Sequence, residues 1–227
     1  LKAFRMMSWK HWLAVLKDPI SLLSLKNSLF LGIVGATLGV VLTLFISYTI
    51  VKLRTPASGI LESLSFLSFS FPGIVIGVGF MWFFVRTPLY ATIGSLLIGY
   101  IATYLPYGIR PLTSAFVQIH RDLEESSRVC GGGMFYTLRR IIVPLLIPGI
   151  VSAWILMATM FVRELSVSVV LSRPGNEVLA VQILRFAEDG LWGKLSALGI
   201  LMILASTTLV VLASAAGAKL TKLRKEG

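Results

Sequence analysis

The sequence predicts an all-α fold, a polytopic membrane helix bundle of about five transmembrane spans. Of its 227 residues, 56% are hydrophobic and 14% are charged, and the mean hydropathy is +0.86. Such values are typical of integral membrane proteins and lie far outside the range of soluble domains. The apolar runs are also long enough to cross a hydrocarbon core of about 30 Å as helices.

The predicted spans follow one another along the chain, with two long polar segments at residues 110–140 and 163–194. The spans cover residues 28–51, 60–85, 89–109, 141–162 and 195–216. Pro72-Gly73 lies near the centre of the second span. A proline there removes a backbone hydrogen bond, so the freed carbonyl must face protein or a water-filled path. We therefore expect a kink, and this pair is a candidate gate.

The segments that flank the spans are predicted to lie outside the bilayer core. In residues 1–27, Trp12 and Leu16 stand at helical spacing and Pro19 follows the run, which indicates an amphipathic helix in the outer interface. Residues 219–227 form a basic tail. The formal net charge of +11 favours contacts with anionic lipid headgroups over nucleic acid in a chain this apolar.

A polar, glycine-broken insert, residues 113–140, is predicted to form a two-helix knob beside the bilayer. A first helix from about Thr113 to Cys130 would gather residues three and four apart on one face, with Cys130 as a small buried residue. Gly131 opens a run of three glycines and can take the left-handed conformation that ends a helix. A second amphipathic helix, from Met134, would then climb into the membrane.

The knob resembles the cytoplasmic coupling loop of the permeases of binding-protein-dependent ABC transporters, whose transmembrane domain is MetI-like. That family's pattern is Glu-Ala-Ala, three residues, Gly, nine residues, Ile, one residue, Leu-Pro. At the same spacing this sequence has Glu125, Ser126, Ser127, Gly131, Ile141 and Pro144. Serines replace the two alanines and Val143 replaces the leucine. The resemblance implies that these residues dock into a separate ATPase and that residues 28–218 are the transmembrane domain.

The distribution of Lys and Arg favours a cytoplasmic knob. With the knob inside, eleven cations lie in cytoplasmic segments and five in outer ones, but the N-terminal segment adds five more outside. We keep this orientation because four acidic residues balance the outer loop 163–194, whereas the tail 219–227 is almost purely cationic.

The outer loop 163–194 holds the candidate contacts for a periplasmic solute-binding protein. A turn is expected at residues 173–176, followed by a helix from Val178 that ends near Gly190. The candidate docking residues are Arg163, Glu164, Glu188 and Asp189; the alternative is an ordinary solvated loop. The segments RELSVSVVL and EDGLWG are similar in sequence to the C-terminal half of ferric-iron permeases. Thiamine, phosphonate and polyamine permeases have a similar arrangement of segments.

Other chemistries find little support in the sequence. With two histidines and one cysteine no His/Cys metal site can be built, and no catalytic group is predicted. The glycine triplet precedes Met134-Phe135 rather than the Gly-Lys-Ser/Thr of a phosphate loop, so ATP and Mg²⁺ are expected on a partner chain and no cofactor on this one. A membrane-embedded enzyme would need ionisable groups at membrane depth, and the predicted spans hold only Glu62, two residues into the second span, where an interfacial residue is expected. A passive channel, the other alternative, gives no account of the knob.

The resemblance implies a set of partners. These are two cytoplasmic ABC ATPase subunits, a periplasmic solute-binding protein and a second permease unit, all at a bacterial inner membrane. The chain begins at Leu1, with neither a methionine nor a recognisable signal peptide. We therefore expect a fragment or one half of a longer permease, with the second unit supplied by another copy or by upstream sequence.

Overall fold

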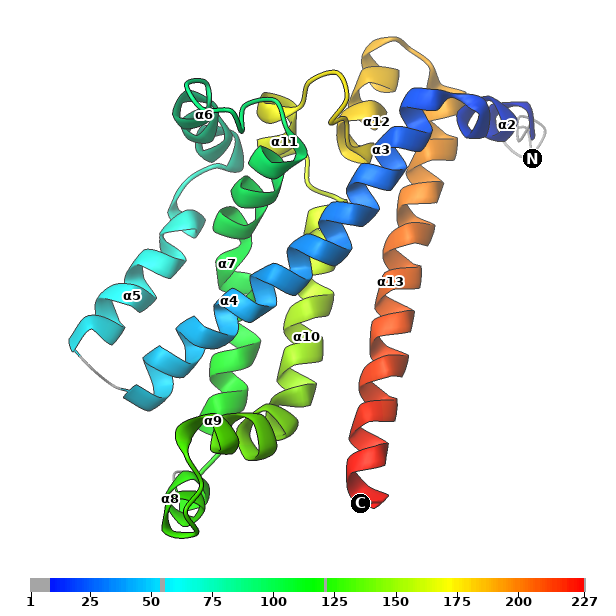
Figure 1. Cartoon of the computed structure of the whole chain (residues 1–227). Coiled ribbons are helices and arrows are strands. Elements are labelled where there is room, and N and C mark those ends of the chain that lie inside the picture. Colours follow the sequence, from blue (N-terminus) through cyan, green and yellow to red (C-terminus); the bar gives the residue numbers. More distant parts are fainter. Residues whose placement is uncertain (1–8, 54–55, 121, 227) are drawn as a thin grey trace.

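A computed structural model describes residues 9–53, 56–120 and 122–226 of the chain, and within them every regular element is a helix (Figure 1). The all-α prediction is therefore confirmed. The knob, the start of α5 (Pro56–Phe66) and the C-terminus of α13 (Trp192–Glu226) lie at one end of the bundle. The N-terminal helix α2 (Trp9–Lys17), α11 (Ser166–Leu171) and α12 (Leu179–Glu188) lie at the other.

The first span is longer than the sequence predicted. It runs without a break from Pro19 to Leu53 through α3 (Pro19–Phe30), the π-helical turn η1 (Leu31–Gly35), α4 (Ala36–Tyr48) and a second π-helical turn η2 (Thr49–Leu53). The prediction placed its start at Ser28, because the serines before it lower the hydropathy. Those serines are buried against protein instead, and the Ser28 hydroxyl accepts the Leu179 amide at 2.8 Å.

The second span is not one kinked helix, as was predicted, but two helices at 107° to each other. The first part is α5 with the 3₁₀ turn η3 (Leu67–Ser70), and the second is α6 (Gly73–Phe84). Phe71 is extended (φ −117°, ψ 139°) because a following proline disfavours the helical region, and Pro72 is extended too (ψ 136°). Two successive extended residues turn the chain instead of bending a helix.

The third span, α7 (Ile93–Val117), passes through the centre of the bundle (Figure 1). It continues through Pro106 and Pro111, beyond the predicted end at residue 109. The single helix predicted from Thr113 to Cys130 is wrong, because α7 ends at Val117 and a separate helix α8 (Asp122–Val129) follows.

The remaining chain forms two long helices and the outer loop between them. Helices α9 (Met134–Thr137), η4 (Leu138–Ile142, a π-helical turn) and α10 (Val143–Val162) are continuous, so the second knob helix climbs into the bundle as predicted. Within the described residues, Pro19–Leu53, Met134–Val162 and Trp192–Lys222 are individually long and apolar enough to span a membrane, and the bent pair counts as a fourth. Helix α7 runs between the same two ends (Figure 1).

The core forms where α4, α7 and α10 meet. Its largest fully buried side chains include Tyr100, Leu112, Met157 and Phe161. Close approach of α7 and α10 depends on glycine, since a Cβ at Gly149 would lie 2.7 Å from the Ala115 Cβ, which is fixed to the backbone. This core holds the ends of the spans, and therefore the knob and the outer loop, in fixed positions.

Candidate functional site

The knob closes through a helix-ending turn at the glycine triplet. The Gly131 amide donates to the Arg128 carbonyl at 2.9 Å and the Gly132 amide to the Ser127 carbonyl at 2.8 Å. Gly131 has φ +80°, so the prediction of a left-handed helix terminator is confirmed. This pair of hydrogen bonds satisfies carbonyls that would be orphaned at the end of α8, which fixes the direction in which α9 leaves.

A polar contact clamps the two knob helices together. The Ser127 and Thr137 hydroxyls lie 2.8 Å apart and are buried, and Thr137 also donates to the Gly133 carbonyl at 3.1 Å. Gly132 packs tightly here, because a Cβ on it would lie 2.5 Å from the Ser127 Oγ. The residue that replaces the family's second alanine is thus part of the knob's internal structure.

The knob is also attached to the spans from which it projects. Lys52, at the end of the first span, lies 2.8 Å from a Glu124 carboxylate oxygen and donates to the Ile119 carbonyl at 2.9 Å. Around this contact Phe116, Ile119, Ile142 and Leu146 form a buried apolar cluster. In the sequence Lys52 is one of the eleven predicted cytoplasmic cations and Glu124 has no signal of its own, because nothing in the spacing shows that two residues so far apart meet.

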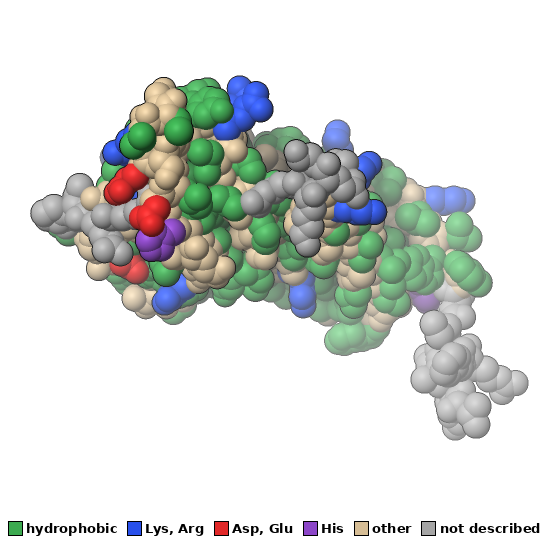
Figure 2. Space-filling model, turned by 90° about the horizontal axis from the view of Figure 1, so that it is seen from below, with side chains coloured by type: hydrophobic (Ala, Val, Ile, Leu, Met, Phe, Trp, Pro, Cys, Tyr) green, Lys and Arg blue, Asp and Glu red, His purple; other side chains and the backbone are tan. Residues whose placement is uncertain are grey.

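The outward face of the knob is apolar and exposed. The exposed fraction is 88% for Val129 and 74% for Phe135, with Met134 and Tyr136 beside them. Figure 2, which looks onto this end of the molecule, shows acidic and hydrophobic side chains close together over the knob. Cys130, predicted to be buried, is exposed because α8 ends before it could pack inward.

Four of the six predicted coupling residues line one shallow hollow of about 610 Å³ in the knob. They are Ser126, Ser127, Gly131 and Ile141. Glu125 is exposed on α8 outside the hollow, and Pro144 lies in the first turn of α10. Because proline has no amide hydrogen, its position is consistent with the π-helical turn η4 immediately before it.

Glu164 is not part of an exposed docking rim, and that prediction is corrected. Its side chain is 2% exposed and accepts three hydrogen bonds, from the Val167 amide (2.8 Å), the Ser168 amide (2.9 Å) and the Ser168 hydroxyl (2.7 Å). Burial raises the pKa of the Glu164 carboxyl above its ordinary value of 4.5, and these hydrogen bonds oppose the rise. From the sequence, a charged residue two positions before a short helix is expected at the surface. Here the Glu164 carboxylate instead caps the first turn of α11.

The other predicted docking residues are exposed as expected. Arg163, Glu188 and Asp189 all lie at the outer end, with α12 ending at Glu188 and Gly190 at φ +69° just after it. The predicted turn is present, since the Asn176 amide donates to the Arg173 carbonyl at 3.1 Å.

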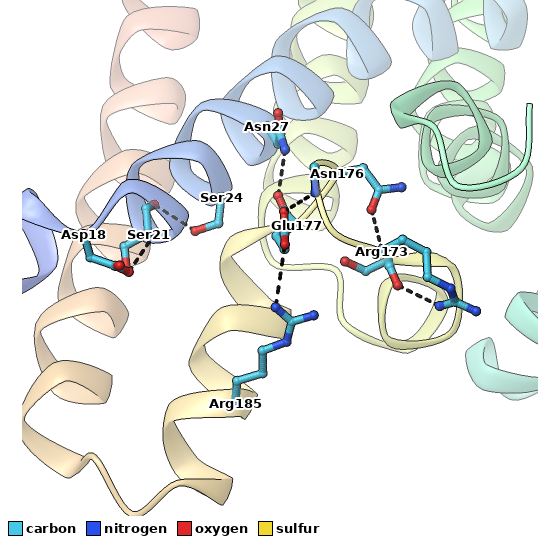
Figure 3. Close-up of polar contacts among 10 residues, drawn as sticks. Asp18, Ser21, Ser24, Asn27, Arg173, Asn176, Glu177 and Arg185 are labelled. Atoms are coloured by element: carbon cyan, nitrogen blue, oxygen red, sulfur yellow. Dashed lines mark hydrogen bonds and ion pairs between the residues drawn. The ribbon is translucent and has the colours of Figure 1, made fainter.

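Polar contacts that the sequence does not predict hold the outer loop in place, and one of them joins it to the first span (Figure 3). The Asn27 side chain donates to the Glu177 carbonyl at 2.8 Å, and the Glu177 carboxylate accepts the Gly175 amide at 2.8 Å and lies 3.8 Å from Arg185. Arg173 donates to the Tyr90 hydroxyl at 3.0 Å. The outer loop is therefore held in one conformation by specific contacts, and the exposed charged residues project from it.

The candidate gate and the outer loop meet directly. A Cβ on Gly73, the first residue of α6, would lie 2.7 Å from the Ser166 Cβ of α11, and one on Gly77 would lie 3.1 Å from the Val167 Cα. Pro72 itself is exposed. The bend at Pro72 thus sets α6 against the short helix that Glu164 caps.

The described residues contain no group of three or more His, Cys, Asp or Glu side chains close enough to hold a metal ion. The hydrogen bonds and ion pairs described above join parts of this chain to one another.

Comparison with known proteins agrees with this arrangement. Residues 35–222 match the family described as binding-protein-dependent transport system inner membrane component. The chain is 30% identical over 194 residues to the ferric transport system permease protein FbpB of Actinobacillus pleuropneumoniae, covering 83% of this chain and 28% of that protein. It is 24% identical over 205 residues to the spermidine/putrescine transport system permease protein PotC of Haemophilus influenzae, covering 90% and 80%.

Two solved structures share the fold. One is a bacterial alginate ABC transporter in complex with an alginate pentasaccharide-bound periplasmic protein (TM-score 0.74, 16% identity, 96% of this chain and 85% of that one). The other is an inward-facing MetNI methionine ABC transporter (TM-score 0.67, 18% identity, 88% and 94%). The chain spans 28% and 36% of the length of two ferric permeases that it matches. The family match and the fold together show that this chain belongs to the binding-protein-dependent, MetI-like ABC transporter permeases, multi-pass proteins of the inner membrane.

Proposed function

We propose that this chain is the permease subunit, or half of one, of an ABC importer, and that it couples a transport pathway to ATP hydrolysis on a partner chain. The observation that carries the proposal is the knob, which is fixed internally by the Ser127–Thr137 contact yet presents Val129 and Phe135 to solvent. Exposed apolar patches rimmed by polar groups mark protein contact sites. A rigid apolar projection suits a cleft on an ATPase.

The cycle follows from linkage between the docked knobs and the spans. ATP-driven closure of two ATPase subunits would favour one arrangement of the two docked knobs, and the spans attached to them would rock between inward-open and outward-open states. This chain forms one wall of the pathway, and a second permease unit forms the other. A periplasmic binding protein would deliver the cargo at the outer loop.

Docking of the knob is tested by placing a charge on its apolar face. Phe135→Asp is expected to abolish co-purification of the ATPase, because a carboxylate cannot be desolvated in an apolar cleft without a partner. Trp9→Asp is the matched control, since Trp9 is 81% exposed at the opposite end of the molecule. If Phe135→Asp retains the ATPase as well as Trp9→Asp does, the knob is not the docking site.

For the cargo we propose ferric iron, with a polyamine as the second candidate. The ferric permease relative is the more similar in sequence at 30% identity, whereas the polyamine relative is matched over more of its length, 80% against 28%. Uptake of labelled ferric iron and of labelled spermidine, measured in cells with and without this permease, decides between them. Loss of spermidine uptake with unchanged iron uptake would contradict the iron assignment.

A further inference from the structure

Lys52 joins the first span to the knob through two short contacts. Its ammonium lies 2.8 Å from the Glu124 carboxylate on α8 and 2.9 Å from the Ile119 carbonyl in the segment between α7 and α8. The side chains of Lys52 and Glu124 are only 5% and 13% exposed. A lysine at the end of a membrane span usually extends into water or headgroups, whereas this one is folded into protein.

The contact adds a third connection to the knob. The chain itself connects the knob to α7 on one side and, through α9 and η4, to α10 on the other. The first span ends at Leu53, far from the knob in sequence, and Lys52 attaches it to α8. The Ile119 carbonyl, just beyond the last turn of α7, is taken by this ammonium, so Lys52 also marks where α7 gives way to the knob.

We propose that Lys52 is a positioning residue that makes the first span move together with the coupling knob. The proposal rests on the proposed function, in that the knob must transmit movement between an ATPase and the spans. It adds a specific route: displacement of α8 pulls on η2 through the Glu124–Lys52 pair, and the continuous helix from Pro19 to Leu53 carries that displacement to the outer end. There, Asn27 contacts the outer loop through the Glu177 carbonyl.

Stability alone is a weak reason for this pair. Desolvation offsets much of the attraction between two buried charges, and apolar replacements of such pairs are often no less stable. Next to the pair, a buried apolar cluster already packs the first span against the knob; it is formed by Phe116, Ile119, Ile142 and Leu146. Hydrophobic contacts are not directional, so they do not by themselves fix the position of one helix relative to the other. The hydrogen bond that the ammonium donates to the Ile119 carbonyl is directional, and the 2.8 Å ion pair to Glu124 places η2 beside α8.

The test uses the complete complex of permease, ATPase and solute-binding protein in lipid vesicles. The measurement is the fold-stimulation of ATP hydrolysis by the binding protein, which requires a signal to pass through the spans. Lys52→Met and Glu124→Gln are expected to lower this stimulation about fivefold or more, the lower end of typical coupling between sites. Basal hydrolysis and ATPase co-purification are expected to stay unchanged. Lys52→Arg keeps the charge and the donors and is expected to restore stimulation.

Asp122→Asn is the matched control, since it removes the exposed 3.0 Å contact to His120 in the same part of the chain and lies outside the proposed route. Normal stimulation in Lys52→Met overturns the proposal, and so does a loss of assembly in both Lys52→Met and Glu124→Gln, which would make the pair necessary for folding. If only Lys52→Met fails to assemble, Glu124→Gln decides. A wild-type complex that shows no stimulation at all would instead contradict the proposed function.

Discussion

The hydroxyl oxygens of Ser127 and Thr137 lie 2.8 Å apart across the glycine turn, ten residues apart in sequence and buried from solvent. One belongs to α8 and the other to α9, so this contact sets the angle between the two helices of the knob. Gly132 packs against Ser127, and the Gly132 amide donates to the Ser127 carbonyl at 2.8 Å. The geometry of the knob therefore depends on the absence of a side chain at this position.

A methyl group added to the glycine triplet is expected to disturb the turn at one position and to have no effect at the next. In Gly132→Ala the new Cβ would meet the Ser127 Oγ at 2.5 Å and the Ser127 carbonyl at 2.9 Å, so the turn must open; in Gly133→Ala nothing lies within 4 Å. Gly132→Ala should lower the stability of the permease in detergent by about 1–3 kcal/mol and uncouple ATP hydrolysis from transport, whereas Gly133→Ala should do neither. Equal behaviour of the two variants would show that the turn geometry is unimportant.

Gly131→Val tests the same turn through the backbone. At φ +80° a β-branched residue is strained, although the space around Gly131 is open. Membrane insertion should remain normal while transport driven by ATP is lost. Transport at the wild-type rate with the ATPase still bound would remove Gly131 from the coupling mechanism.

Glu164 is expected to make stability depend on pH. Its pKa is raised in the folded protein because the carboxyl is buried, so the folded state binds the proton more tightly than the unfolded chain does. The stability contributed by this group is fully present below its ordinary value of 4.5 and is lost as the pH rises through the raised folded pKa. Thermal unfolding in detergent across this range should show that loss in the wild type but not in Glu164→Gln. Parallel pH profiles for the two proteins would contradict this assignment.

The knob could be predicted from sequence better than the contacts that hold it. A helix-ending glycine is a local property, so the left-handed Gly131, the turn at residues 173–176 and the end of α12 all followed from neighbouring residues. The 107° turn at Pro72 did not, because a proline allows either a kinked helix or two extended residues and the packing of α6 on α11 decides between them. The Lys52–Glu124 contact was not predicted, because its partners lie far apart in the sequence. Glu164 was predicted to be exposed because a charged residue near a span end is usually solvated, and its burial depends on how α11 packs against α6.

The exposed charges at the outer end are expected to contribute to docking of the binding protein. Glu188 and Asp189 extend into solvent at the end of α12. Reversing both to Lys should weaken binding-protein affinity by up to about fivefold per charge at low salt, and the effect should shrink at high salt because exposed charges are screened. Asp122→Lys, a charge reversal at the opposite end, is the control. Unchanged affinity at low salt would make this rim an ordinary solvated loop.

The contact between α6 and α11 is expected to be sensitive to the size of residue 73. In Gly73→Ala the new Cβ would lie 2.7 Å from the Ser166 Cβ, which is fixed to the backbone of α11 and cannot rotate away. Overpacking of this kind typically costs about 1–3 kcal/mol. In Gly79→Ala, on the same helix, nothing lies within 4 Å, and replacing glycine inside a helix should stabilise it by about 0.5–1 kcal/mol.

The two alanine variants are best compared by thermal unfolding in detergent together with uptake into vesicles. We expect Gly73→Ala to unfold at a lower temperature and to transport more slowly, because α6 can no longer seat against the helix that Glu164 caps. Gly79→Ala should unfold slightly later and transport normally. If Gly73→Ala transports normally despite its lower stability, α6 and α11 hold the outer end together without gating it, and the candidate gate at Pro72-Gly73 must be abandoned.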